Sequence, residues 1–157
     1  MAGESLSSER AVRIVRIVWV GLLVVQLFFG MGAVWFVSYR PAPEPAEGHP
    51  WGLYAVGAVL LIVLAVGGYL VRRRLYERGR LDDGAVAAEG YLRGNLVLLV
   101  PMAVMGVAGM GLAIAAGSLM PASLITFAAL IVQVINMPTG DPLDPGRYAK
   151  DQTPKSA

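Results

Sequence analysis

The sequence predicts an all-α integral membrane protein, a bundle of four transmembrane helices arranged as two antiparallel hairpins. Four long apolar segments lie at residues 17–37, 51–71, 95–116 and 121–137. Each is close to the ~20 residues that an α-helix needs to cross the hydrocarbon core of a bilayer. None of them contains Asp, Glu, Lys, Arg or His. Charged residues make up only 15% of the chain, against about 25% in soluble domains.

The first segment, 17–37, follows three arginines, a pattern that also begins a secretory signal peptide. Its apolar run is longer than the roughly 7–15 residues of a signal peptide, and no small-residue cleavage site follows it. We therefore expect a membrane helix that is retained. Four prolines in the next stretch, 39–51, favour an extended connection to the second segment.

The second segment, 51–71, is expected to continue as a helix to about Glu77. Asp82 or Asp83 then suits the N-cap of a short amphipathic stretch, 85–93, that leads into the third segment. The four residues 117–120 separate the third segment from the fourth, so these two helices are expected to form an antiparallel hairpin. Prolines and glycines then predict an irregular tail, 138–157. The whole chain, 1–157, is predicted to be a single domain.

The distribution of basic residues predicts the orientation. Twelve of the 13 Lys and Arg residues fall in the ranges 1–16, 72–94 and 138–157, and the remaining one is Arg40. With four crossings, those three ranges lie on one side of the membrane. Because basic residues are retained in the cytoplasm, we expect a multi-pass protein of the inner (cytoplasmic) membrane with both termini in the cytoplasm.

Three small residues in the third segment share one helix face: Gly109, Ala113 and Gly117 stand at i, i+4 and i+8. Small residues at this spacing let a second backbone approach closely. The face is predicted to pack either against another helix of the bundle or against a second copy of the chain. A permeation path lined by glycines is the alternative.

Polar residues are rare within the apolar segments. Gln26 lies near the middle of the first segment, and Gln133 and Asn136 lie one turn apart at the end of the fourth. Gln26 is expected to face protein and to bond across helices, with contact to a substrate as the alternative. Gln133 and Asn136 suit either a small polar vestibule or simple capping. The lack of charge inside the segments argues against an ion or proton pathway.

A basic cluster follows the second segment. We expect its arginines to lie against the anionic headgroups of the bilayer, each contributing about 1 kcal/mol, and to help set the orientation. Nucleic-acid binding is not expected, since no surrounding fold presents these residues. The residues are Arg72, Arg73, Arg74, Arg78 and Arg80.

Neither a metal site nor a cofactor is predicted. Cysteine is absent and His49 is the single histidine, too few ligands for a zinc site. Asp141 with Asp144, and Glu44 with Glu47 and His49, are the remaining acidic groupings, and both suit ordinary turns or loops. No nucleophile–base motif is present, so we do not expect an enzyme.

Residues 91–152 resemble small, uncharacterised four-span membrane proteins of bacteria. The resemblance rests on the step Met137-Pro138-Thr139 after a last apolar helix and on the charged tail that closes with Lys150-Asp151-Gln152. It implies the same architecture and no activity. The layout is also similar to the proteolipid c subunits of rotary ATPases. Those subunits carry an ion-binding carboxylate within an even-numbered helix, and the second and fourth segments here have none.

Two functions remain open from the sequence. The first is a non-catalytic accessory or self-associating membrane subunit, in a homo-oligomer or a larger membrane complex, and it rests on the small-residue face. The second is a small transporter or channel for a neutral or lipidic solute, and it rests on Gln26, Gln133, Asn136 and a kink expected at Pro101 in the third segment.

Overall fold

The computed structural model describes residues 7–39, 51–120 and 122–144. Three long helices dominate this part of the chain: α1 (Ser8–Tyr39), α2 (Trp51–Arg78) and α3 (Ala88–Ala116). A shorter helix, α4 (Ala122–Ile135), and a single 3₁₀ turn, η1 (Asp141–Leu143), complete it. All three long helices are long and apolar enough to cross a membrane. The predicted all-α membrane bundle is confirmed at this level.

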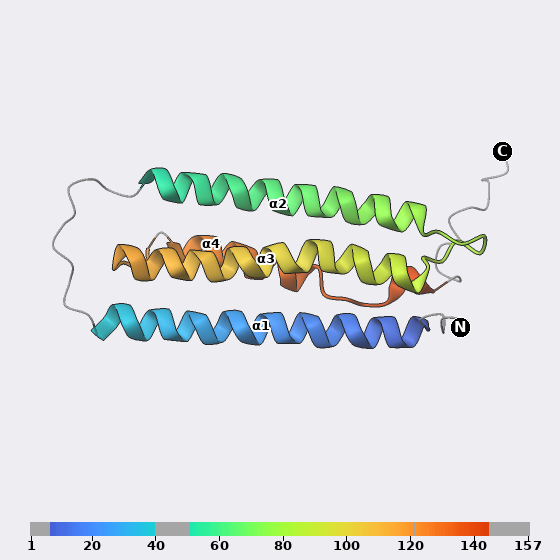
Figure 1. The fold of residues 1–157 in the computed structure, drawn as a ribbon, viewed down its shortest axis with the longest axis horizontal. Coiled ribbons are helices and arrows are strands. Elements are labelled where there is room, and N and C mark those ends of the chain that lie inside the picture. Colours follow the sequence, from blue (N-terminus) through green and yellow to red (C-terminus); the bar gives the residue numbers. More distant parts are fainter. Residues whose placement is uncertain (1–6, 40–50, 121, 145–157) are drawn as a thin grey trace, which may run out of the picture.

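Helix α4 is shorter than predicted. Its 14 residues extend about 21 Å at ~1.5 Å per residue, less than the ~30 Å hydrocarbon core. The predicted segment 121–137 therefore corresponds to a helix of Ala122–Ile135, and α4 alone does not establish a fourth crossing. Beyond α4 the chain continues as a non-helical segment that runs beside the bundle to η1 (Figure 1).

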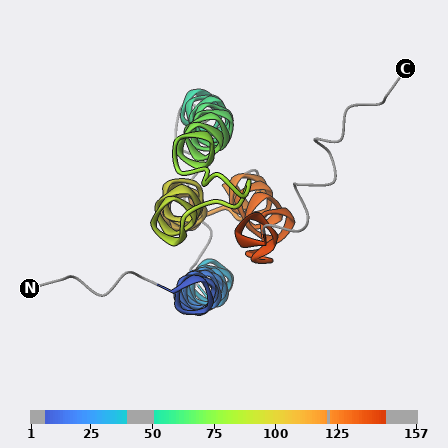
Figure 2. The ribbon, with the colours of Figure 1, turned by 90° about the vertical axis from the view of Figure 1, so that its right-hand side faces the viewer.

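Helix α3 lies at the centre of the bundle. Figure 2 shows α1 and α2 on opposite sides of α3, with α4 on a third side, and α3 packs against all three. Helices α1 and α2 do not pack against each other, so the predicted first hairpin is wrong, although the two helices run in opposite directions. The second predicted hairpin, α3 with α4, is present.

Three clusters of buried apolar side chains make up the core, and each contains residues of α3. One lies at the end of the bundle where α1 and α3 begin, which we call the basic end because it carries Arg10, Arg13, Arg16, Arg72–Arg74, Arg78, Arg80 and Arg93. There Tyr91 and Leu99 of α3 pack with Ala11 and Val15 of α1. The other two clusters join α3 to α2 and α4.

The connection between α2 and α3 is a tight turn. Arg80 and Val86 form an isolated antiparallel bridge, and Gly84 turns the chain with φ 84°, a left-handed conformation open to glycine. The N-cap residue of α3 is Ala87, without a side-chain cap. The prediction of an N-cap at Asp82 or Asp83 is therefore wrong. Asp83 instead accepts a hydrogen bond from the Ala85 N–H (3.0 Å) within the turn.

The three residues of the predicted small-residue face have two different roles: Gly109 and Ala113 pack against α4, and Gly117 ends α3. A Cβ on Gly109 would lie 2.5 Å from Thr126 Oγ1 and 3.1 Å from the Ala122 carbonyl oxygen, so the backbones of α3 and α4 are in close contact here. Ala113 is buried in the cluster that also contains Ala122. Gly117 lies just beyond α3 and ends it in the left-handed conformation, with φ 61°.

Substituting Gly109 by Ala should destabilise the bundle, because the new methyl group meets Thr126 and the α4 backbone. We expect a loss of about 1–3 kcal/mol in the free energy of unfolding, as for overpacked cores. Gly111→Ala is the matched control, since a Cβ there meets no atom within 4 Å. Denaturant unfolding in detergent micelles measures both. An equal effect of the two substitutions would contradict the packing of α4 on Gly109.

Candidate functional site

Gln26 is held between α1 and α3. Its side chain is 1% exposed and lies against Gly106, where a Cβ would overlap the amide oxygen Oε1. The Gly106 carbonyl also accepts a hydrogen bond from Thr126 Oγ1 of α4 (2.8 Å). Three helices thus meet at Gly106, which the sequence analysis did not single out. The signal was present as a fourth small residue, three positions before Gly109 on the same helix.

A hydrogen-bonded cluster joins α2 and α3 to Asn136, the residue that follows α4, at the basic end. Arg72 of α2 donates through Nε to Tyr76 Oη (3.1 Å) and through Nη1 to Asn136 Oδ1 (3.0 Å). Asn95 of α3 donates through Nδ2 to the same Tyr76 oxygen (2.8 Å) and to the Tyr91 carbonyl (2.8 Å). We call Arg72, Tyr76, Tyr91, Asn95, Asn136 and the neighbouring Gln133 the polar cluster.

Ring contacts hold the polar cluster in place. The rings of Tyr76 and Tyr91 stack with centroids 6.1 Å apart and an interplanar angle of 16°. The Arg72 guanidinium carbon lies 5.2 Å from the centre of the Tyr76 ring, within reach of a cation–π interaction. Within the described ranges Arg72 forms no ion pair, so its charge is met by neutral oxygens and an aromatic face.

Several buried polar atoms of the cluster have no hydrogen-bond partner among the described residues: Asn95 Oδ1 and both amide atoms of Gln133. The side chains of Asn95 and Gln133 are fully buried. Buried groups of this kind are rare in folded proteins, and each costs about 1–3 kcal/mol when unpaired. The polar cluster therefore contains buried donors and acceptors that form no hydrogen bond among the described residues.

Helix α1 is tied to the end of α4 and to the segment that follows. Trp19 Nε1 donates to the Gln133 carbonyl (3.0 Å). Arg16 donates through Nε to the Pro138 carbonyl (3.1 Å) and through Nη2 to the Thr139 carbonyl (3.2 Å). The last carbonyls of a helix lack partners within the helix, and α1 supplies donors to this region from outside.

The arginines predicted to face lipid headgroups occupy two environments. Arg73, Arg74, Arg78 and Arg80 are exposed, and Arg73 pairs with Glu77 across one helical turn (2.9 Å). Arg72 points instead to the interior, toward Asn136. The five arginines are close together in the sequence, and Arg72 differs from the others only in the side of α2 on which it lies.

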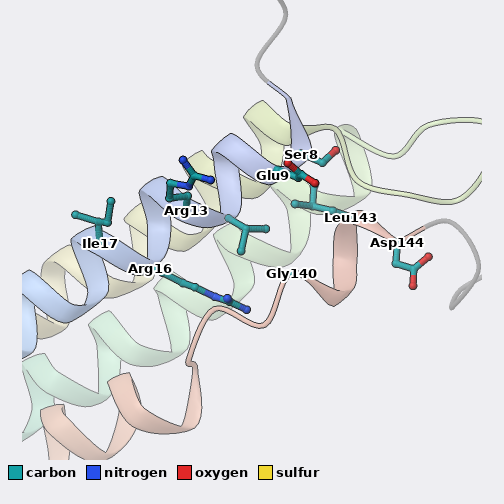
Figure 3. Close-up of a pocket in the computed structure, with 9 residues that line it drawn as sticks. Ser8, Glu9, Arg13, Arg16, Ile17, Gly140, Leu143 and Asp144 are labelled. Atoms are coloured by element: carbon teal, nitrogen blue, oxygen red, sulfur yellow. The ribbon is translucent and has the colours of Figure 1, made fainter.

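Two grooves lie along α1. The first, of about 510 Å³, is at the basic end between the start of α1 and the region of η1 (Figure 3). Its lining includes Glu9, Arg13, Arg16, Leu143 and Asp144. The second, of about 650 Å³, follows α1 from Gln26 to Tyr39 and is mostly apolar.

The two acidic groupings of the sequence, Asp141 with Asp144 and Glu44 with Glu47 and His49, are only partly within the described residues. Asp141 and Asp144 lie in and just after η1, and no group of three or more His, Cys, Asp or Glu residues gathers in the described ranges. Glu44, Glu47 and His49 lie outside those ranges, as do Pro121 and the tail from residue 145. Comparisons with protein families, curated proteins and solved structures find no match to this chain.

We expect opposite effects on the free energy of unfolding when two amide side chains of the polar cluster are replaced by leucine. Asn95→Leu should destabilise the bundle by about 1–2 kcal/mol, because it removes two hydrogen bonds between or within helices. Gln133→Leu should leave stability unchanged or raise it, because it removes two buried atoms that have no partner. Unfolding in micelles measures both.

If Gln133→Leu destabilises the protein as much as Asn95→Leu, the amide of Gln133 is bonded in solution. Thr126→Val serves as a reference substitution, since it removes a single well-formed hydrogen bond between α4 and α3 (2.8 Å).

Proposed function

We propose that the protein is a non-catalytic membrane subunit that crosses the bilayer four times and associates with further copies of itself. The observation that carries this proposal is a face of α3 that none of the other described helices covers. The face lies on the side of α3 away from α4 and between α1 and α2 (Figure 2). Its exposed residues are Val104, Ala108, Gly111 and Ala115, and we call them the open face.

The open face suits contact with another helix. Its members recur at intervals of four, three and four residues, so they share one side of α3. Three of them are small, and a Cβ on Gly111 would meet no atom within 4 Å. Association in membranes depends on close packing, because lipid tails are as apolar as the helix surfaces. Gly109 no longer supports self-association, since α4 already covers it.

The four crossings are supported by the segment after α4. Pro138 is buried, and Leu143 packs beside the cluster of Tyr91 and Val86 at the basic end. The Val86 N–H donates to the Pro142 carbonyl (2.8 Å). Helix α4 together with residues 136–144 therefore extends to the end where α1 begins (Figure 1). The basic residues gathered at this end favour the cytoplasm.

The alternative function, passage of a neutral or lipidic solute, has weaker support. The second groove along α1 is lined in part by Gln26, but the amide atoms of Gln26 and Gln133 have almost no accessible surface. Asn136 is bonded to Arg72 and to the Val132 carbonyl. In the described residues, the polar side chains on which this hypothesis rests are therefore either hydrogen-bonded within the bundle or buried.

A reporter fused after Ala157 should be active in the cytoplasm, and a reporter inserted between residues 40 and 50 should be active outside. Three crossings separate Ala157 from that insertion if α4 and the following segment complete the fourth crossing of the chain. An external signal from the fusion after Ala157 would mean that the chain crosses three times, with α4 ending inside the membrane.

Gly111→Leu and Ala108→Leu should lower the dimer fraction of the protein, because each places a large side chain on the open face. Gly21→Leu is the matched control, since Gly21 is an exposed glycine of α1 whose Cβ would also meet nothing within 4 Å. Crosslinking in native membranes and native mass spectrometry in mild detergent measure the dimer. A strictly monomeric protein in both measurements would overturn the proposal.

A further inference from the structure

The open face is part of a longer stripe that contains every exposed residue of α3. Intervals of four, four and three residues separate its members, so the stripe stays on one side of a nearly straight helix. It begins in the first turn of α3, at the basic end, and reaches the last turn of that helix. We call it the exposed stripe, and its members are Glu89, Arg93, Val97, Val100, Val104, Ala108, Gly111 and Ala115.

The two charged members of the exposed stripe form an ion pair with each other. Arg93 Nη2 donates to Glu89 Oε1 across one helical turn, and the two side chains are 66% and 68% exposed. The contact uses one guanidinium nitrogen and one carboxylate oxygen. Within the described ranges neither side chain makes a further hydrogen bond. Each therefore keeps donors or acceptors for a second charged group.

The ion pair and the rest of the exposed stripe lie at different depths in the proposed membrane orientation. Glu89 and Arg93 precede Asn95, where the charge-free apolar segment begins. Charged groups are tolerated at the headgroup level and are costly in hydrocarbon. A partner for the whole stripe therefore needs an apolar helix surface, with an acidic and a basic residue one turn apart at its cytoplasmic end.

A second copy of α3 meets this requirement in both polarity and charge. Copies inserted in the same orientation are related by a two-fold axis along the membrane normal, so their α3 helices run parallel and the same patch meets itself. In parallel helices packed side by side, a residue contacts residues at its own height and about one turn away. Glu89 of one copy then lies within reach of Arg93 of the other, and the symmetry repeats the contact. In an antiparallel pair Glu89 would lie opposite Ala115, and the charges would have no partner.

We propose that the protein forms a parallel two-fold dimer in which the exposed stripe packs against itself and Glu89 of each copy pairs with Arg93 of the other. This inference rests on the self-association proposed above and adds its geometry. The small residues of the open face let the two backbones come close. The charged pairs at the basic end set the register and the parallel orientation, as flanking charges do in coiled coils.

Charge reversal tests this arrangement. Glu89→Arg gives the stripe two positive residues, and Arg93→Glu gives it two negative ones. Each variant should dimerise with itself about tenfold more weakly than the unaltered protein, because like charges then meet at two symmetry-related contacts. An equal mixture of the two variants should form mainly the mixed dimer, because opposite charges meet again. Native mass spectrometry of the full-length chains in mild detergent separates the three dimers by mass.

The matched control is the ion pair between Arg73 and Glu77 of α2, which has the same one-turn spacing and is also exposed. Glu77→Arg and Arg73→Glu make the same changes of charge at the same end of the bundle. Any effect of net charge on insertion or on general attraction therefore appears in both sets of variants. The control variants should dimerise as the unaltered protein does, and their mixture should give a statistical proportion of mixed dimers.

A statistical proportion of mixed dimers from Glu89→Arg and Arg93→Glu would overturn the parallel arrangement, and so would an equal enrichment with the control variants. If Gly111→Leu still lowers the dimer fraction in either case, self-association through the open face stands without this geometry. A monomeric unaltered protein would overturn both proposals.

Discussion

The contact between α3 and α4 at Gly106 and Gly109 is the constraint on which the rest of the bundle depends. Thr126 bonds to the Gly106 carbonyl and fills the space that a side chain on Gly109 would need. On another side of Gly106 the same absence of a side chain accommodates Gln26 of α1. Because Cβ atoms at these positions would collide with both neighbours, the two glycines determine how closely α1 and α4 approach α3.

A central helix with three neighbours leaves the outer helices unusually open. Helices α1 and α2 each have α3 as their main neighbour, and only 17% of the most apolar part of each is buried. In water such surfaces would drive collapse. In a bilayer they do not, since lipid tails solvate them as well as another helix would. Specific association in the membrane therefore depends on close packing of complementary surfaces, and the proposed self-association uses the small residues of the open face of α3 for that packing.

The sequence predicts which segments are helical more readily than which helices touch. Long apolar runs without charge form α-helices in lipid, because each backbone N–H and C=O group must be hydrogen-bonded within its own segment. The sequence does not indicate which helices pack against each other, because α2 and α3 are apolar on every side and have no distinct hydrophobic face. For the same reason Gln26 was recognised as buried, but its position against Gly106 was not. Arg72 was grouped with its neighbours because a run of arginines carries no information on which one turns inward.

Donors from the other helices stabilise the region where α4 ends. A helix that ends at Ile135 leaves the following carbonyls near the hydrocarbon boundary, where unbonded polar groups are costly. Arg16 of α1 bonds two of them, at Pro138 and Thr139, and Trp19 bonds that of Gln133. From the other side of the bundle, Arg72 bonds the Asn136 side chain. Two of the arginines that count toward the proposed orientation therefore also stabilise the non-helical end of the fourth segment. Under the proposed orientation, a basic residue at these two positions contributes both to topology and to fold, whereas Arg74 and Arg78, which are exposed, contribute to topology.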